Sequence, residues 1–447
     1  MTVPGLDALA KRVLAEWQHG TLILQDPGID PPAFLAGASL YPRILSRTRE
    51  NGEILCALGL TPLPRDRDAR AGAPGPVFQG WAFPGQGELR DEWAGFPEHF
   101  AGTPMLLLRW GGGEKDHTCI LEVRASGSED ARRIAAELEH LAVHADPHAS
   151  ASPTGSWAAP TACTVPHEDA GSCPRQDPDR ELYKQAFRKI KQFIGQDPQR
   201  KAVLGRRTTF RICCSLEQMV RQMMTAPRDH SLYLYAPAEH ACYCGMTPER
   251  LFRRQGNRIW TEAVAGTADV SDPVLAGKLL QSTKNNLENR IVRDWITVIL
   301  ARRCRSVTAS GPEKIRYGSL VHICRKIEGV LQGCPDDGDL VAALHPTPAL
   351  AGEPREEALA VIRDAENFHR GWYGGIFGCQ EKGVSEYCVM IRGMLTREDK
   401  AYIYTGGGIV RDSDAEEEWQ ELNSKLKCIQ DSFDPEGILF TGRENRS

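Results

Sequence analysis

The segment from Tyr404 to Leu426, YTGGGIVRDSDAEEEWQELNSKL, combines two features that could both contact a charged ligand. Three consecutive glycines, beginning at Gly406, are typical of a loop that brings backbone N–H groups close to an anion. A nucleotide-phosphate loop would continue with lysine and then serine or threonine. This segment continues instead with acidic residues: Asp412, Asp414, Glu416, Glu417, Glu418 and Glu421. The pattern indicates a ligand that needs both amide donors and carboxylates.

The acidic residues belong to a helix whose faces differ in chemistry. Glu418, Glu421 and Lys425 are spaced i, i+3 and i+7, so they share one face, while two leucines lie on another. A solvated acidic helix with a Glu–Lys pair has the same pattern, so the spacing alone does not establish a binding site. Glu288, in the helical segment KNNLENRIVRDW, has the same two interpretations.

Further segments contain residue types that could act on a substrate. Lys201 begins an apolar strand-like run, where a lysine can be partly desolvated. Glu249 follows a Thr-Pro turn and precedes three arginines, so an ion pair at the start of a helix is the alternative to a catalytic acid. Gly266 lies beyond a strand, where a backbone can approach a ligand closely. The proline-rich segment from Leu344 to Pro354 is typical of a rigid binding loop.

Composition limits the class of protein. The 447 residues are 25% charged with a formal net charge of −5, which argues against broad binding to nucleic acid or anionic membranes. No apolar run approaches the roughly 20 residues that span a bilayer, and the first residues lack a signal-peptide pattern, so we expect a cytoplasmic protein. The 14 cysteines contain no CxxC pair, which favours reduced, packed thiols over a zinc site.

Strands and helices come in blocks, which favours an α+β fold over a doubly wound parallel sheet. Residues 1–145 alternate short apolar runs with proline and glycine, as antiparallel strands with a few helices would. Residues 145–178 are expected to form a long surface connection. The expected helices are one capped by Asp177 with Pro178 at its first position, one from about Lys278 to Arg303, one from about Glu356 to Asn367, and one opening at Ser413 with a capping box to Glu416.

Nine segments, in this order, are similar to the motifs of the chorismate-utilising enzymes: KAVLGR, TPERL, TEAVAGT, KNxxEN, VHI, HPTPALAGEP, RGWYGG, VMIRG and GGGIVRDSDAEEEWQELNSKL. That family contains isochorismate synthase, salicylate synthase, anthranilate synthase large subunits and aminodeoxychorismate synthase. The resemblance covers roughly Leu182 to Phe433 and is strongest to isochorismate synthases of the menaquinone-pathway type. It implies the chorismate-binding fold of large antiparallel β-sheets flanked by helices, with a variable β-rich N-terminal half (1–175) and a catalytic region (176–437).

The resemblance also implies a reaction, in which water adds at C2 of chorismate while the C4 hydroxyl leaves. Lys201 would be the general base that activates the water, and Glu249 the general acid that protonates the leaving hydroxyl, which requires a raised pKa at Glu249. The arginines after Glu249 would lower that pKa, so we expect them to point away from the site. Mg²⁺ would bind the ring carboxylate, with Glu288 and Glu421 as its ligands and Glu418 close by or acting through water.

A second group of residues would hold the substrate by the same resemblance. Arg392 and the backbone amides of Gly406 and Gly408 would meet the enolpyruvyl carboxylate, because arginine suits a bidentate carboxylate contact. Lys425 would assist at the ring carboxylate. The rest of the implied wall consists of Gly266, Thr267, His322, Ala349 and Tyr373; packing in the core is the alternative role for His322 and Tyr373.

Three positions distinguish reactions within the family. Ala265 stands where aminodeoxychorismate synthases carry a nucleophilic lysine, and Lys201 indicates water rather than ammonia as the nucleophile. Ala349 stands where the pyruvate-eliminating members typically carry threonine. These residues favour isochorismate synthase; salicylate synthase and a non-catalytic chorismate-binding relative are the alternatives. We expect no obligatory glutaminase subunit and a monomer or weak dimer, whose product could serve menaquinone, a siderophore or another pathway.

Overall fold

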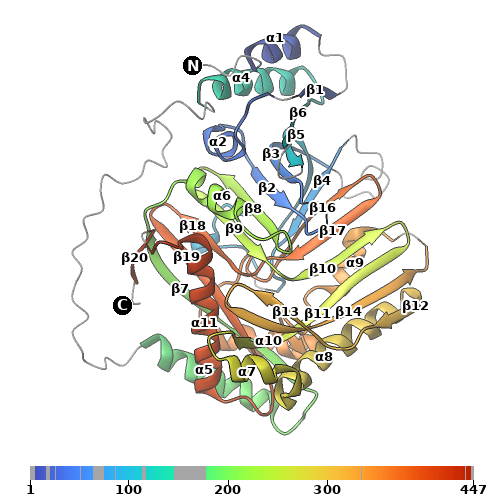
Figure 1. Cartoon of the computed structure of the whole chain (residues 1–447), viewed down its shortest axis with the longest axis vertical. Helices are drawn as coiled ribbons and strands as arrows, with labels where there is room; N and C mark the ends of the chain where they lie inside the picture. Colours follow the sequence, from blue (N-terminus) through green and yellow to red (C-terminus); the bar gives the residue numbers. More distant parts are fainter. Residues whose placement is uncertain are drawn as a thin grey trace.

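The computed structural model describes residues 6–16, 21–25, 27–50, 52–63, 75–85, 87–112, 117–144, 178–333, 335–437 and 439–443 (Figure 1). The expected surface connection over residues 145–178 and the Asp177 helix cap therefore lie outside the described residues, apart from Pro178 itself.

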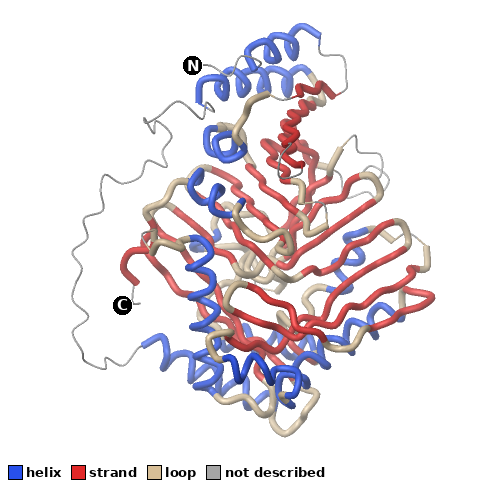
Figure 2. Tube along the Cα trace, viewed as in Figure 1, coloured by secondary structure: helices blue, strands red, loops and turns tan. Residues whose placement is uncertain are grey.

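Helices gather mainly at the two ends of the molecule, and most of the strands lie between them (Figure 2). The helices are α1 (Leu6–Glu16), α2 (Pro31–Gly37), α4 (Ser128–His144), α5 (Pro178–Ile194), α6 (Leu216–Met224), α7 (Pro273–Lys278), α8 (Thr283–Ala301), α9 (Asp337–Leu344), α10 (Arg355–Ala365) and α11 (Ala415–Phe433), with the 3-10 turns η1 (Asp91–Trp93) and η2 (Leu279–Gln281). Helices α5, α7, α8 and α10 gather at one end of the molecule, and α1 and α4 at the other (Figure 1).

The strands form one network of antiparallel pairs. They are β1 (Thr21–Gln25), β2 (Arg43–Arg47), β3 (Ile54–Pro62), β4 (Val77–Trp81), β5 (His99–Gly112), β6 (His117–Arg124), β7 (Lys201–Ile212), β8 (Ser231–Ala238), β9 (Ala241–Thr247), β10 (Arg250–Gln255), β11 (Arg258–Asp269), β12 (Cys304–Ala309), β13 (Glu313–Tyr317), β14 (Leu320–Leu331), β15 (Gly352–Glu353), β16 (Ile376–Glu381), β17 (Val384–Val389), β18 (Gly393–Arg397), β19 (Lys400–Ile409) and β20 (Phe440–Arg443). This arrangement confirms the α+β expectation of large antiparallel sheets flanked by helices.

Strands from the N-terminal half pair with strands from the C-terminal half. β2 pairs with β8, and β4 pairs with β16. An aromatic core packs near these junctions, where Trp372 stacks on Tyr235 with ring centroids 5.0 Å apart and on Phe100 at 5.6 Å. The expected division between residues 1–175 and 176–437 stays a prediction.

The three consecutive glycines do not form a loop. They lie within β19, where Gly406 pairs with Gly205 and Gly408 pairs with Val203 of β7. The loop expectation is therefore wrong, because pairing with β7 continues through the glycines to Ile409.

Two helix starts also differ from the sequence prediction. Ser282 caps α8 by accepting a hydrogen bond from the Asn285 amide at 3.3 Å, so the long helix begins at Thr283 instead of near Lys278. Asp414 caps α11 by accepting from the amides of the second and third helical residues at 2.8 and 3.2 Å. Its carboxylate satisfies two end amides, and the expected Ser413 capping box is replaced by a bond from the Val410 amide to the Ser413 hydroxyl.

Among the helices of the described segments, none is long and apolar enough to cross a membrane. The cysteines in those segments are free thiols, and most of them are buried.

Candidate active site

A cavity of about 80 Å³ lies where β7, β11, β14 and β19 approach α8 and α11. Its lining includes most of the residues that the sequence indicated: Glu249, Gly266, Thr267, Glu288, His322, Ala349, Tyr373, Arg392, Gly406, Gly408 and Lys425. Lys201 and Glu421 pair with the lining residues Glu288 and Lys425. Glu418 lies beside Gly407 and pairs with Lys284, neither of which lines the cavity. The fold thus brings together residues that span more than 200 positions of the sequence.

Lys201 is the first residue of β7, and its side chain is fully buried. Its Nζ lies 3.0 Å from Oε1 of Glu288, which α8 presents toward the cavity. A Cβ on Gly408 would lie 2.1 Å from the same Glu288 oxygen and 2.7 Å from the Lys201 side chain. The Lys201–Glu288 pair occupies the space that a side chain at position 408 would need, so glycine is required there.

Glu249 lies in the connection between β9 and β10, not at the start of a helix. Burial raises its pKa to about 7, against the opposing charges of Lys201 and Arg392. The three arginines that follow it are bound elsewhere, as expected: Arg250 donates to Glu386 at 3.1 Å, Arg254 donates to Asp337 at 2.7 Å, and Arg253 stacks over the Trp260 ring. Glu249 can therefore hold a proton near neutral pH.

The three carboxylates at or beside the cavity, Glu288, Glu418 and Glu421, are each paired with a lysine. Glu288 pairs with Lys201, Glu421 with Lys425 at 2.6 Å, and Glu418 with Lys284 at 2.8 Å. Burial and the nearby charge of Glu421 raise the pKa of Glu418 to about 7, although Lys284 opposes this. Burial opposes ionisation of Glu421 as well, but Lys425 and Lys284 bring its pKa below the ordinary value.

These carboxylates have the donor chemistry that Mg²⁺ prefers, since all of their ligand atoms are oxygens. Within the described segments, no group of three acidic, histidine or cysteine side chains converges as a ready-made metal site. Mutual influence on pKa nevertheless places Glu288, Glu418 and Glu421 in one buried electrostatic neighbourhood. These three carboxylates fit a hard cation in chemistry. A bound cation would balance the negative charge that the lysine ammonium groups now balance.

The glycines of β19 leave two amides pointing away from β7. The Val203 amide donates to Ala351 at 2.7 Å and the Gly205 amide donates to Glu366 at 2.6 Å, so neither bonds to β19. Their cross-strand partners Gly406 and Gly408 therefore sit in non-hydrogen-bonded pairs, with their own N–H groups directed away from β7. Both glycines line the cavity, as an anion site made of amides requires.

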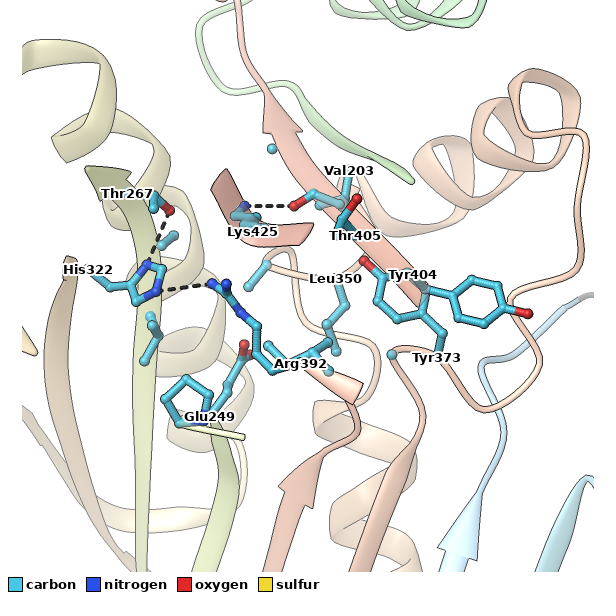
Figure 3. Close-up of a pocket in the computed structure, with 18 of the residues that line it drawn as sticks. Val203, Glu249, Thr267, His322, Leu350, Tyr373, Arg392, Tyr404, Thr405 and Lys425 are labelled. Atoms are coloured by element: carbon cyan, nitrogen blue, oxygen red, sulfur yellow. Dashed lines mark hydrogen bonds between the residues drawn. The ribbon is translucent and has the colours of Figure 1, made fainter. Parts of the chain in front are cut away.

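Arg392 lies at the centre of the cavity wall with a strained backbone, at a φ of +57°. Its Nη2 lies 3.1 Å from Nε2 of His322, and the His322 Nδ1 lies 3.1 Å from the Thr267 hydroxyl (Figure 3). Its Nη1 is buried, and no described residue bonds to it. Because Nη2 of Arg392 is held by His322 while Nη1 bonds to no described residue, this guanidinium is placed to bind an anion.

His322 is a neutral acceptor in this chain of contacts. Burial, together with the charges of Arg392 and Lys425, lowers its pKa well below the ordinary value. Because a guanidinium can only donate, His322 Nε2 accepts from Arg392, and the ring proton is on Nδ1, facing Thr267. His322 therefore orients Arg392 without adding charge.

The remaining predicted residues shape the cavity. Gly266 has a φ of +80° at a bulge between β11 and β14, and a Cβ there would lie 3.0 Å from Asn285. The Tyr373 ring stacks on Tyr404 with centroids 5.4 Å apart, beside Gly406 (Figure 3). Lys425 donates to the Gly406 carbonyl at 2.7 Å.

Some residues of the site were missed from the sequence. Lys284 is the partner of Glu418, and it opens the KNxxEN segment that was noted only as a motif. Arg370 lines the cavity while fully buried in an ion pair with Glu366. Asn289 donates to the carbonyls of Ala263 and Ile323 and so ties α8 to β11 and β14. The position of Asn289, a polar residue next to Glu288 in the middle of a helix, was the sequence signal that could have indicated its role.

Residues 65–433 match the family described as chorismate binding enzyme. The chain belongs to this family. The match includes every residue that the sequence indicated for the site, and it extends into the N-terminal half, beyond the motifs that lie between Leu182 and Phe433.

Individual members of the family are moderately similar to the chain. Isochorismate synthase MenF of Haemophilus influenzae is 34% identical over 240 residues, which are 52% of this chain and 56% of the relative. Isochorismate synthase MenF of Escherichia coli is 33% identical over 263 residues, 57% and 60% of the two chains. MenF of Bacillus subtilis is 29% identical over 372 residues, which are 79% of this chain and 74% of the relative. The chain spans about half the length of the first of these relatives.

Solved structures confirm the chorismate-binding fold. The structure of MenF, the menaquinone-specific isochorismate synthase from Escherichia coli, superposes with a TM-score of 0.74 at 23% identity, over 96% of this chain and 99% of that one. Anthranilate synthase component I from Streptococcus pneumoniae superposes with a TM-score of 0.60 at 18% identity, over 93% of both chains.

Proposed function

We propose that the protein is an isochorismate synthase, which converts chorismate to isochorismate by adding water at C2 and releasing the C4 hydroxyl as water. The observation that carries the proposal is a buried lysine and a buried protonatable carboxyl that act on the same cavity: the charge of Lys201 influences the pKa of Glu249, which is about 7. The relatives named isochorismate synthase support the same reaction.

In this mechanism Lys201 first releases its ammonium proton to solvent, and the neutral amine then accepts a proton from the water that attacks C2. Glu249 donates a proton to the C4 oxygen as it leaves. One water is consumed and one is released, so the substrate is isomerised with no net change in composition. Return of a proton from Lys201 and delivery of one to Glu249 through solvent complete the cycle. General acid and base groups are both needed because hydroxide leaves poorly and water attacks poorly.

The enolpyruvyl carboxylate is held by the free Nη1 of Arg392 and by the amides of Gly406 and Gly408. The amides and the guanidinium are already fixed, by the β7 pairing and by His322, so little reorganisation is needed on binding. Ala265 and Ala349 leave the reaction at isochorismate: alanine at position 265 offers no nucleophile, and Ala349 offers no hydroxyl beside the substrate.

A direct assay tests the proposed reaction. Purified protein incubated with chorismate and Mg²⁺ is expected to form isochorismate as the major product by chromatography, with no effect of an ammonium salt. Salicylate with an equal amount of pyruvate at neutral pH would instead identify a salicylate synthase, and absence of any product would favour a chorismate-binding relative without catalysis.

The implied metal is Mg²⁺, which Glu288 and Glu421 would hold, with Glu418 beside them. When bound, Mg²⁺ would neutralise the ring carboxylate of the substrate and stabilise electron density that moves toward it. We expect Glu421→Gln to weaken Mg²⁺ binding at least about tenfold, because an anionic oxygen ligand is replaced by a neutral amide. Calorimetric titration with Mg²⁺ measures this without turnover, and Asp431→Asn, an exposed acid of the same helix that pairs with Lys427, is the control.

Arg392 is expected to contribute mainly to substrate affinity. Arg392→Gln should raise the KM for chorismate at least about tenfold, because a charge-assisted contact to a carboxylate is lost. Arg411→Gln, an exposed arginine paired with its neighbour Asp412, is the matched control. Steady-state kinetics measures both variants; an unchanged KM in Arg392→Gln would remove this residue from carboxylate binding.

We also propose that the enzyme works in the cytoplasm without a glutaminase subunit, as a monomer or weak dimer. Relatives named MenF favour menaquinone formation as the use of its product.

A further inference from the structure

A second cavity, of about 790 Å³, lies next to the first. One continuous segment contributes to both: Glu366 to His369 line the second cavity, and Arg370, Tyr373 and Gly374 line the first. Its volume falls within the range of roughly 300–1,000 Å³ that is typical of small-molecule sites. None of the residues assigned above to catalysis or metal binding is part of its described lining.

The buried acidic groups of this cavity are already neutralised. Glu92 accepts hydrogen bonds from Arg207 and, at 2.8 Å, from the Tyr404 hydroxyl. Glu366 is held by the fully buried Arg370, at 2.5 Å, and by the Gly205 amide. Neither carboxylate is therefore available to repel an anion or to attract a cation.

Positive charge and unused donors remain in the lining. Arg397 donates to the Glu92 carbonyl at 2.9 Å, and Arg363 donates to the Gly85 carbonyl at 2.9 Å. Carbonyl oxygens orient these guanidinium groups without cancelling their charge. Arg207 Nε and His369 Nδ1 are buried, and no residue of the described segments bonds to either atom. The exposed Asp91 is the one acid at the rim without an ion pair among the described residues, so cationic groups dominate.

Aromatic rings form another part of the wall. Phe368 and Tyr402 both line the cavity, and the Arg207 guanidinium lies 5.7 Å from the centre of the Tyr402 ring. Flat rings beside fixed guanidinium groups suit a ligand that has a planar ring and one carboxylate.

We propose that the second cavity binds a small ring carboxylate and that its occupancy changes the affinity of the first cavity for chorismate. The binding part of this proposal, that a ring carboxylate binds, depends on the second cavity alone. The coupling part, that its occupancy changes chorismate affinity, rests on the proposed function, in which chorismate binds the first cavity.

Two direct contacts connect the cavities. Tyr404 lines the first cavity, stacks on Tyr373, and donates its hydroxyl to Glu92 in the second. Arg370 lines the first cavity and pairs with Glu366 in the second. A ligand carboxylate that binds the unused Nε of Arg207 would shift this guanidinium while it stays paired with Glu92. That shift would move the Tyr404 hydroxyl and the wall on which Tyr373 rests. Coupling of this kind is reciprocal, so each ligand would change the affinity of the other by the same factor.

Equilibrium titration with benzoate and benzamide tests the binding part. We expect benzoate to bind wild type and Arg392→Gln equally, to bind Arg363→Gln and Arg397→Gln at least about tenfold more weakly, and to bind at least tenfold more tightly than benzamide. Arg363 is exposed, so its variant keeps the test valid if Arg397→Gln does not fold. Equal binding to wild type and Arg363→Gln, loss of binding only in Arg392→Gln, or equal binding of benzamide would overturn the proposal.

Titration of chorismate into the Lys201→Met variant, with and without saturating benzoate, tests the coupling part. The expected result is a change of at least about fivefold in the dissociation constant of chorismate. An unchanged constant would overturn the coupling. If chorismate does not bind at all while benzoate does, the proposed function fails and the second site stands.

Discussion

Replacement of Lys201 by methionine is expected to reduce the conversion of chorismate by at least about a hundredfold while leaving the chain folded. Methionine keeps most of the buried volume of the lysine and removes the atom that accepts a proton from water. Product formation measured by chromatography gives the rate, and circular dichroism with thermal unfolding checks the fold.

The same substitution affects two neighbours in predictable directions. Glu288 loses its ion-pair partner, and since its side chain is 13% exposed it can still contact solvent, so the cost in stability is smaller than for a fully buried unpaired charge. The charge of Lys201 lowers the pKa of Glu249, so that pKa should rise when the lysine is removed. The acid therefore stays protonated, and loss of rate reports the missing base.

Lys427→Met is the matched control, because Lys427 is an exposed lysine of α11 that pairs with Asp431 at 2.8 Å. Its rate should equal that of the wild-type chain. Wild-type turnover in Lys201→Met would exclude Lys201 as the base.

Several of these features could be predicted from the sequence because they depend on local pattern. Short apolar runs separated by proline and glycine indicated the antiparallel strands, and the spacing of Glu418, Glu421 and Lys425 placed them on one helix face. Motif order then indicated which distant segments share a cavity. The structure brings Lys201 and Glu288 within 3.0 Å, although 86 residues separate them and neither side chain by itself distinguishes a buried site from the surface.

Other features depend on contacts that no local pattern encodes. Three glycines are as typical of a loop as of a strand packed against carboxylates, and only the pairing of Gly408 with Val203, beneath the Lys201–Glu288 pair, decides between them. Ser413 and Asp414 are both good caps, and the choice depends on which side chain reaches two free amides. Lys284 could not be matched to Glu418 because their helices, α8 and α11, meet only in the folded chain.

Glu249→Gln is expected to lose most of the catalytic rate and at the same time to stabilise the protein at alkaline pH. Glutamine cannot donate a proton to the leaving C4 oxygen, so a loss of roughly a hundredfold or more is expected. Under the proposed mechanism the active form of Glu249 in the wild-type chain is the protonated one, and burial raises its pKa to about 7. The kcat/KM of the wild-type enzyme should therefore fall as pH rises above about 7. The residual activity of Glu249→Gln should not show this fall.

The effect on stability has the opposite sign. Burial raises the pKa of Glu249 from its ordinary value of 4.5 to about 7, so between these values the folded chain keeps a proton that the unfolded chain has lost. Stability then falls as pH rises through this range, because the unfolded state binds fewer protons, and the deficit reaches about 3 kcal/mol above pH 7. Glutamine stays neutral and avoids this cost, so chemical unfolding at pH 8.5 should show Glu249→Gln to be more stable than wild type, with little difference at pH 4.5.

Glu398→Gln, at the turn between β18 and β19, is the control and should show no such pH-dependent gain. Equal stability of Glu249→Gln and wild type at both pH values would mean that Glu249 is not held protonated by burial, and the acid of the reaction would have to be sought elsewhere.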